Sequence, residues 1–236
     1  NHLTWFTDMK IDGKDVYPKL HDKLKESGFD KKEPISKQLY DIYGLYPAPG
    51  DRHVGEFFPY YMKEEVLMEQ DYEWKNNDFK VVDGWREEAR VLFDEVRTKK
   101  EGYEEFLKGS GETATYFIRS LATGDISDEM VNVINNGYID NVSSGIIVEL
   151  PTYIDEFGLH PQKIGKLPDA IAAQCDRLGR EYLLMVEAAA TCNYELARQA
   201  MFLDPLVSNC KYPELLLKDL IRANLDLLPE AWEKHC

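Results

Sequence analysis

The stretch that decides the fold is PDAIAAQCDRLGREYLLMVEAAATC, residues 168–192, which carries the strongest helix pattern in the chain. Its apolar residues recur at spacings of three and four, which is typical of a helix face buried in a core. These residues are Ile171, Cys175, Leu178, Tyr182, Met185 and Ala189. Two further helices are predicted on its C-terminal side, over residues 193–203 and 213–227.

The N-terminal side of this helix predicts shorter elements of both kinds. We expect helices over residues 19–28, 36–43, 56–62, 85–108 and 113–123, and strands over 3–11, 130–134 and 144–150. The segment Tyr46-Pro-Ala-Pro-Gly50 predicts a loop without regular structure, because prolines and glycine interrupt both helices and strands. The fold class is therefore α+β, mostly helical with small antiparallel sheets. Since no repeat or linker divides the chain, we expect residues 1–236 to form a single domain.

The charge balance excludes some classes of partner. The 236 residues contain 43 acidic and 28 basic side chains, for a net charge of −15, which disfavours contact with a nucleic-acid backbone. No apolar run reaches membrane-spanning length, and no signal peptide opens the sequence, so we expect no membrane partner. The four cysteines form no Cys-x-x-Cys pair, which favours free thiols in a reducing compartment and predicts a cytoplasmic protein.

Two of the five histidines are candidate metal ligands. His2 and His53 each lie at the boundary of a predicted element beside short polar residues, where sites are commonly placed. A neutral imidazole suits manganese, iron, nickel or zinc. By spacing alone, however, the alternative of packed loop histidines is favoured. The sequence has no His-Glu-x-x-His, no Gly-x-Ser-x-Gly and no phosphate-binding glycine loop.

Several motifs, taken in their order along the sequence, indicate more than any single residue does. Asn1-His2-x-x-Trp5 resembles the Asn-His-x-x-Trp motif of glycoside hydrolase family 4. The stretches 135–141, 147–151, 187–189 and 197–206 are similar to later motifs of that family, in the family's order, so the resemblance covers nearly all of residues 1–207. It implies the C-terminal half of a longer glycosidase, with a fold like the C-terminal domain of lactate dehydrogenase. The family's NAD-binding Rossmann half, with its glycine-rich loop and Cys-Asn-Pro metal motif, is not present here, so we expect the isolated chain to be inactive.

The resemblance also implies a redox route for glycoside cleavage, unlike the usual two-carboxylate scheme. NAD takes a hydride from C3 of the sugar, a base removes the acidified C2 proton, and the glycosidic bond leaves by elimination. Water then adds to the enone, and C3 is reduced again. Mn²⁺, or another divalent ion such as Ni²⁺, Co²⁺ or Fe²⁺, stabilises the developing charge on the C2 and C3 oxygens.

Carried over by residue, the resemblance implies that His2 is a metal ligand and that Asn1 contacts sugar hydroxyls. The segment Asp51-Arg52-His53 is expected to supply the C2 base and sugar contacts. Some family members use a tyrosine as base and others an aspartate, and Asp51 is the candidate here. Its alternative role is to cap the turn after Gly50. His53 would be a second metal ligand or would hydrogen-bond the sugar.

The substrate expected from this resemblance is an α-linked hexuronide. The sequence Pro-Ala-Pro-Gly-Asp-Arg-His-Val looks closer to the hexuronide-cleaving branch, and the guanidinium of Arg52 would match a carboxylate in a bidentate way. The alternatives are a neutral α-glucosidase or α-galactosidase, a domain like those of 2-hydroxy-acid dehydrogenases, and a purely structural or oligomerisation domain. The family's habit predicts a homodimer or homotetramer.

Overall fold

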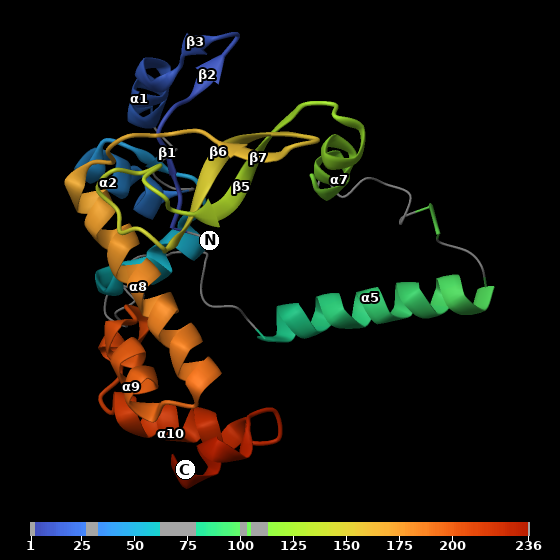
Figure 1. Cartoon of the computed structure of the whole chain (residues 1–236), viewed down its shortest axis with the longest axis vertical. Coiled ribbons are helices and arrows are strands. Elements are labelled where there is room, and N and C mark those ends of the chain that lie inside the picture. The colour runs from blue at the N-terminus through green and yellow to red at the C-terminus, as the bar shows by residue number, and fades with distance from the viewer. Residues whose placement is uncertain (1–2, 27–32, 62–78, 100–102, 105–112, 236) are drawn as a thin grey trace. The chain divides into compact units, whose positions relative to one another are not determined.

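The computed structural model describes residues 3–26, 33–61, 79–99, 103–104 and 113–235. The α-helices are α1 (Tyr17–Lys25), α2 (Pro34–Tyr43), α3 (Asp51–Val54), α5 (Phe79–Lys99), α7 (Ala114–Thr123), α8 (Asp169–Thr191), α9 (Tyr194–Leu203) and α10 (Pro213–Ala223) (Figure 1). Four 3-10 helices are described: η1 (Gly55–Phe57), η2 (Pro59–Tyr61), η3 (Leu206–Asn209) and η4 (Glu230–His235). The strands are β1 (Trp5–Phe6), β2 (Lys10–Ile11), β3 (Lys14–Asp15), β4 (Tyr46–Pro47), β5 (Ser127–Ile134), β6 (Ile147–Asp155) and β7 (Gly158–Pro161). The predicted fold class, mostly helical α+β with small antiparallel sheets, is confirmed.

The strands of the described chain form three small sheets. β1 pairs with β4 and β2 with β3, both antiparallel, and the third sheet has the order β5-β6-β7. By Cα packing, the chain divides into two compact units. One comprises residues 1–69, 130–150 and 161–236, and the other comprises residues 70–129 and 151–160. The expectation of a single domain over residues 1–236 stays a prediction.

The predicted strand over residues 3–11 is two strands, β1 and β2. In the turn that follows β2, Asp12 and Gly13 both have positive φ, at 51° and 72°. Two successive residues in this region make a type I′ turn, whose twist suits a two-residue hairpin between β2 and β3.

The proline-rich loop contains a short strand, so the prediction of no regular structure over residues 46–50 was wrong for its first two positions. Tyr46 and Pro47 form β4 and lie opposite Phe6 and Trp5 of β1. A proline is accepted there because this sheet has only two strands, and a proline on an edge strand need not donate to a partner.

The helix predicted over residues 168–192 is confirmed as α8. Pro168 occupies the position before its first residue, and Cys192 ends it with a left-handed backbone, φ 50°, and an N–H that donates to the Ala188 carbonyl. This reversal sends the chain back, so that α9 packs along α8 (Figure 1). Asn193 caps α9 by accepting the N–H groups of Glu195 and Leu196 at 3.0 and 3.3 Å.

The predicted apolar stripe of α8 holds for only part of the helix. Ile171 and Leu178 are buried, as expected, whereas Tyr182 and Met185 are 42% and 50% exposed and Ala189 is also exposed. The second half of the helix buries a different pair of residues, Glu181 and Ala188. Periodicity could not reveal this, because the buried face depends on where the short turn after α8 directs α9.

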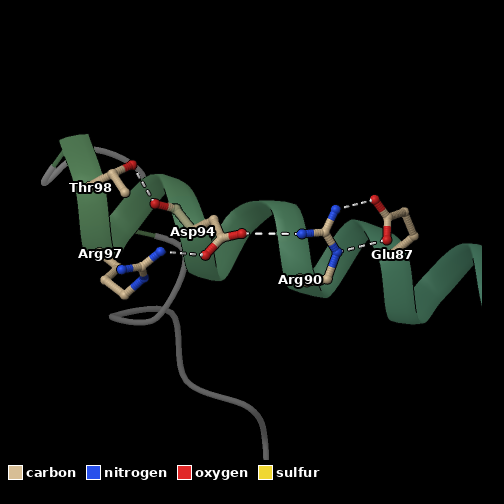
Figure 2. Close-up of polar contacts among 5 residues, drawn as sticks. All are labelled: Glu87, Arg90, Asp94, Arg97 and Thr98. Carbon is tan, nitrogen blue, oxygen red and sulfur yellow. Dashed lines mark hydrogen bonds and ion pairs between the residues drawn. The ribbon is translucent and has the colours of Figure 1, made fainter.

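The long charged helix is α5, which begins six residues earlier than predicted, at Phe79. The prediction extended to residue 108, but residues 100–102 and 105–108 lie outside the described residues. One side of α5 carries a run of ion pairs, shown in Figure 2, in which Arg90 binds Glu87 at 2.6 Å and Asp94 at 3.2 Å, and Arg97 binds Asp94 at 3.2 Å. These side chains are exposed, so water screens their charges and each pair contributes little to the stability of the helix.

The three cysteines that the structure describes agree with the prediction of free thiols, whereas Cys236 lies outside the described residues. Cys175, Cys192 and Cys210 are free cysteines. Burial raises the pKa of the Cys175 thiol to about 11, so this sulfur stays protonated and unreactive near neutral pH. Within the described part of the chain, every helix is too short or too polar to cross a membrane.

Candidate functional site

Two segments that the sequence singled out, the beginning of the chain and the Asp-Arg-His segment, are joined by the β1–β4 sheet. β1 follows the Asn-His motif directly, and β4 directly precedes the loop that leads into α3. Trp5 lies opposite Pro47 in the register of this sheet, and the Ala48 N–H donates to the Thr4 carbonyl at 2.9 Å. The fold therefore brings together two segments that are more than forty residues apart in the sequence.

An aromatic cluster lies beside this sheet and packs the end of the Asp-Arg-His segment. Phe58 is 1% exposed, and the edge of the Trp5 ring meets it with centroids 6.5 Å apart. Trp5 also contacts Tyr43 at 5.5 Å, and Phe58 contacts Tyr61 at 6.4 Å. The Tyr61 hydroxyl donates to the Gln38 side chain at 2.6 Å, which ties η2 to α2. Trp5 of the Asn-His-x-x-Trp motif thus packs against Phe58, which lies shortly after the Asp51-Arg52-His53 segment.

Asp51 is buried, with 5% of its surface exposed, and its carboxylate binds the start of α2. The Ile35 N–H donates to Oδ2 and the Ser36 N–H to Oδ1, both at 2.7 Å. Pro34, the first residue of α2, has no N–H, so these are the first two donors of the helix. Asp51 therefore caps a helix that begins seventeen residues before it in the chain. This confirms a capping role, although for α2 and not for the turn after Gly50.

Glu33 makes the reciprocal contact at the start of α3. Its Oε2 accepts the Asp51 N–H at 2.8 Å, and Asp51 is the first residue of α3. Each helix is thus capped by a carboxylate from the start of the other, as in an exchanged version of the capping box. We call these contacts, Glu33 and Asp51 with the Ile35 and Ser36 amides, the Glu33–Asp51 clasp. Partial burial raises the pKa of the Glu33 carboxyl, and the negative charge of Asp51 adds to this rise, whereas the hydrogen bond from the Asp51 N–H opposes it.

Tyr46 borders the clasp from β4. Burial, followed by the negative charges of Glu33 and Asp51, raises the pKa of its phenol to about 12. A phenol with such a pKa stays protonated at neutral pH. Tyr46 therefore offers a hydrogen-bond donor near the clasp and is a poor base.

Of the remaining predicted site residues, the structure describes His53 fully and the others in part or not at all. His53 lies on α3 and is half-buried, and its backbone N–H donates to the Gly50 carbonyl at 3.0 Å. Asn1 and His2 lie outside the described residues, as does the side chain of Arg52. The functional roles given to Asn1, His2, Asp51, Arg52 and His53 therefore stay predictions. Sequence reasoning missed Glu33, although Pro34 marks the first position of a helix and so points to Glu33 as its flanking residue.

Metal binding was tested against the donors that the structure describes. Among the described residues, no three or more histidine, cysteine, aspartate or glutamate side chains are grouped so that they could hold a metal ion. The expectation of a Mn²⁺ site stays a prediction.

A second polar junction, which the sequence did not reveal, lies where α8 meets η1 and α9. The Arg177 guanidinium donates to the Leu203 carbonyl at 3.1 Å and to the Phe57 carbonyl at 3.5 Å, so it links α8 to the ends of both elements. Glu181 lies one turn further along α8 and is 2% exposed. Burial, reinforced by the charge of Asp204 and opposed by that of Arg177, raises the pKa of Glu181 to about 7.

The Asn-Asn-Gly motif has a structural role in the described chain. Asn135 is fully buried, and its amide nitrogen donates to the carbonyls of Ile139, Val142 and Ser143 at 2.8–3.2 Å. Its side-chain oxygen accepts the Ile139 N–H at 3.0 Å. Gly137 has φ 81°, a conformation that favours glycine. The motif therefore folds its own loop around one asparagine, and all these partners belong to the loop itself.

Known proteins resemble this chain over nearly its whole length. The model of the family 4 glycosyl hydrolase C-terminal domain matches residues 1–207. An alpha-galactosidase of Bacillus subtilis (strain 168) is 30% identical over 98% of this chain and 54% of its own length. An alpha-galacturonidase of Thermoanaerobacterium saccharolyticum is 30% identical over 99% of this chain and 53% of its own length. The chain thus spans about half the length of the curated relatives it matches.

Solved structures share the fold. The crystal structure of lplD from Bacillus subtilis has a TM-score of 0.81 at 27% identity and covers 93% of this chain and 53% of its own. A 6-phospho-alpha-glucosidase from gut microorganisms, solved with NAD and glucose-6-phosphate, has a TM-score of 0.75 at 26% identity, covering 98% of this chain and 53% of its own. A 6-phospho-beta glucosidase of Thermotoga maritima, solved with manganese, NAD⁺ and glucose-6-phosphate, has a TM-score of 0.73 at 23% identity, covering 97% of this chain and 53% of its own.

Proposed function

Since the chain belongs to the family 4 glycosyl hydrolases, as their C-terminal domain, we propose a function for it within such an enzyme. It would be the substrate- and metal-binding half of an NAD-dependent glycosidase. The observation that carries the proposal is the β1–β4 pairing. It brings the chain directly after the Asn-His motif beside the loop that leads to Asp51, Arg52 and His53. Segments that hold a metal ligand, a base and a sugar contact must meet at one substrate, and the pairing of β1 with β4 supports such a meeting.

The proposed enzyme includes an NAD-binding half, which the greater length of the relatives supports. Bound NAD would supply a hydride acceptor for C3 of the sugar, and a divalent metal such as Mn²⁺ would supply positive charge at the C2 and C3 oxygens. His2 would be the contribution of this chain to the metal site, and Asn1 would hydrogen-bond a sugar hydroxyl. The enzyme would be cytoplasmic and a homodimer or homotetramer, and light scattering on the purified protein would test the last point.

Asp51 is the proposed base for the C2 proton. Each of its carboxylate oxygens accepts one N–H in the clasp and has a second lone pair, so the group retains the capacity to accept a proton. His53, from the same short helix, would bind the sugar or the metal. The burial of Asp51 at the end of a helix would hold the base in one orientation, which is what proton transfer at a fixed carbon requires.

The proposed substrate is an α-linked galacturonide or glucuronide. Arg52 would bind the carboxylate of the sugar, and one relative at 30% identity is an alpha-galacturonidase. The second candidate is a neutral α-galactoside or α-glucoside, which is favoured by the equally similar alpha-galactosidase.

The test uses the full-length protein that carries this chain, stripped of nucleotide and metal. Nitrophenyl α-galacturonide, α-glucuronide, α-galactoside and α-glucoside would be assayed with NAD, Mn²⁺, both or neither. Hydrolysis that needs both additions supports the proposal, and the fastest substrate names the sugar. Hydrolysis that is indifferent to NAD would indicate a conventional hydrolase. If no glycoside is cleaved, NAD reduction by 2-hydroxy acids would separate a dehydrogenase from a structural domain.

A further inference from the structure

The start of α3 depends on contacts from outside the helix. α3 has four residues, too few for a helix to be stable by its own hydrogen bonds. At its N-terminus, the His53 and Val54 amides donate to the Gly50 carbonyl at 3.0 and 3.1 Å. The Asp51 amide has no carbonyl partner of this kind within α3, and it donates instead to Glu33 at 2.8 Å. Glu33 is therefore what fixes the first peptide of α3.

The Glu33 carboxylate also lies close against the residue before α3. A Cβ atom added to Gly50 would lie 3.4 Å from Oε1 and 3.5 Å from Oε2 of Glu33. Both carboxylate oxygens thus face the Gly50–Asp51 peptide from one side. The position of this peptide determines where the next two side chains, Arg52 and His53, begin.

Holding two carboxylates in one clasp has an electrostatic cost. Asp51 and Glu33 carry the same charge, and Glu33 is only half-buried, so a neutral or smaller capping side chain would avoid their repulsion. The length of the glutamate side chain nevertheless lets its carboxylate oxygen reach the Asp51 amide at the start of the other helix. A fixed position of the Asp51 backbone, needed for function, would explain why this electrostatic cost is present.

We infer that Glu33 is a positioning residue of the active site, which holds the Asp51–Val54 turn so that Asp51, Arg52 and His53 meet the sugar. This inference rests on the proposed glycosidase function. Glu33 acts through the Asp51 amide and does not itself touch the substrate. What the role requires is an acceptor oxygen at that distance, and the negative charge is dispensable.

The experiment compares Glu33→Ala and Glu33→Gln in the full-length protein. Glutamine keeps an oxygen acceptor at the same reach, whereas alanine removes it. A displaced reacting group can cost about 100-fold in rate, so we expect Glu33→Ala to lower kcat roughly tenfold or more with a smaller change in KM. Glu33→Gln should restore kcat to within a few-fold of the unmodified protein. Glu26→Gln is the matched control, because Glu26 is exposed and its carboxylate pairs with Lys23 at 2.9 Å.

Each result of this experiment either supports or contradicts the positioning role of Glu33. A kcat for Glu33→Ala that stays within twofold of the unmodified protein would overturn the inference, and so would an equal loss in Glu33→Gln, since then the charge and not the acceptor would be needed. If Glu33→Ala does not fold, Glu33→Gln alone decides, because the inference requires it to fold and to turn over. Amide hydrogen exchange over residues 50–55 is read in parallel, and faster exchange in Glu33→Ala but not in Glu33→Gln is expected. If the unmodified protein cleaves no glycoside, the proposed function fails, while the exchange data still report whether Glu33 holds the turn.

Discussion

Gly179 of α8 lies against Ile146 so closely that a side chain would not fit between them. A Cβ atom added at Gly179 would stand 2.6 Å from Cδ1 and 2.9 Å from Cβ of Ile146, which is 2% exposed. Real Cβ atoms do not approach other carbons this closely. Gly179 is therefore present to let a helix approach the loop that Asn135 organises, despite the lower helix propensity of glycine.

Gly179→Ala should destabilise the protein by about 1–3 kcal/mol, because the new methyl group overpacks a buried contact. Gly84→Ala is the control within another helix, since a Cβ atom there would meet nothing within 4 Å. That change should be neutral or stabilising by up to about 1 kcal/mol, the gain in helix propensity. Urea unfolding followed by circular dichroism measures both. Equal effects of the two substitutions would contradict the packing argument.

Asp51→Ala should also destabilise the protein, by about 1–3 kcal/mol, because two amides at the start of α2 lose their acceptors. The control is Asp41→Ala, which removes an exposed pair with Lys37 on the same helix and should cost less than about 1 kcal/mol. Chemical denaturation at neutral pH gives the comparison. If the two variants are equally stable, the cap contributes nothing measurable.

Asp51→Asn tests the base while part of the cap is kept, because an amide retains one of the two acceptor oxygens that bind the start of α2. With the full-length protein, we expect turnover to fall by roughly 10²–10⁴-fold, the usual contribution of a general base. Incorporation of deuterium from solvent at C2 of the sugar should be lost as well. Normal deuterium incorporation in this variant would assign the base to another residue.

Glu181 predicts a specific pH dependence of stability. Its folded pKa of about 7 lies above its unfolded value of about 4.3, so the folded state binds the proton more tightly between these values. The stability that the protonated form contributes is therefore present below about pH 4.3 and is lost as the pH rises through 7. Ionising this 2% exposed side chain should cost on the order of 2 kcal/mol by pH 8.

Glu181→Gln should remove that dependence and leave the protein more stable than the unmodified form at pH 8 but not at pH 4.5. Glu187→Gln, at an exposed position of the same helix, should leave the pH profile unchanged. Thermal unfolding at intervals between pH 4.5 and 8.5 measures the difference. Parallel profiles for the unmodified and Glu181→Gln proteins would show that Glu181 titrates normally.

Arg52→Leu should reduce the turnover of α-hexuronides far more than that of neutral α-glycosides, because only the former present a carboxylate to the guanidinium. Loss of a charge-assisted pair costs about 2–3 kcal/mol, or roughly 30- to 150-fold in kcat/KM for the uronide. Arg86→Leu is the control, since Arg86 is 77% exposed on α5 and pairs with Asp83. Equal losses on both substrate classes would end the case for a uronide.

The residues at the start of α2 show how far sequence reasoning reached into the site. Asp51 was identified with both a catalytic and a capping interpretation, and its hydrogen bonds confirm that it caps a helix. The helix it caps could not be foreseen, because hydrogen bonds to a residue sixteen positions away leave no local pattern. Glu33 was missed for the same reason. Glu181 was missed because the α8 stripe was drawn from apolar residues only, and a buried carboxyl breaks that rule.

Local interactions made several elements predictable from the amino-acid sequence by itself. Asp12-Gly13 determined the first turn, and the apolar spacing over residues 168–192 determined α8, because turn chemistry and periodicity depend on residues that are neighbours in the sequence. The ordered motifs determined the family in the same way.

Only the tertiary structure decided which of these parts meet. It paired Trp5 with Pro47, joined Glu33 to Asp51, and chose Glu181 over Tyr182 as the buried residue of α8. Each of these outcomes depends on the direction in which a short turn sends the next element. That direction is set by packing against distant residues, so it cannot be read from the periodicity of either segment alone.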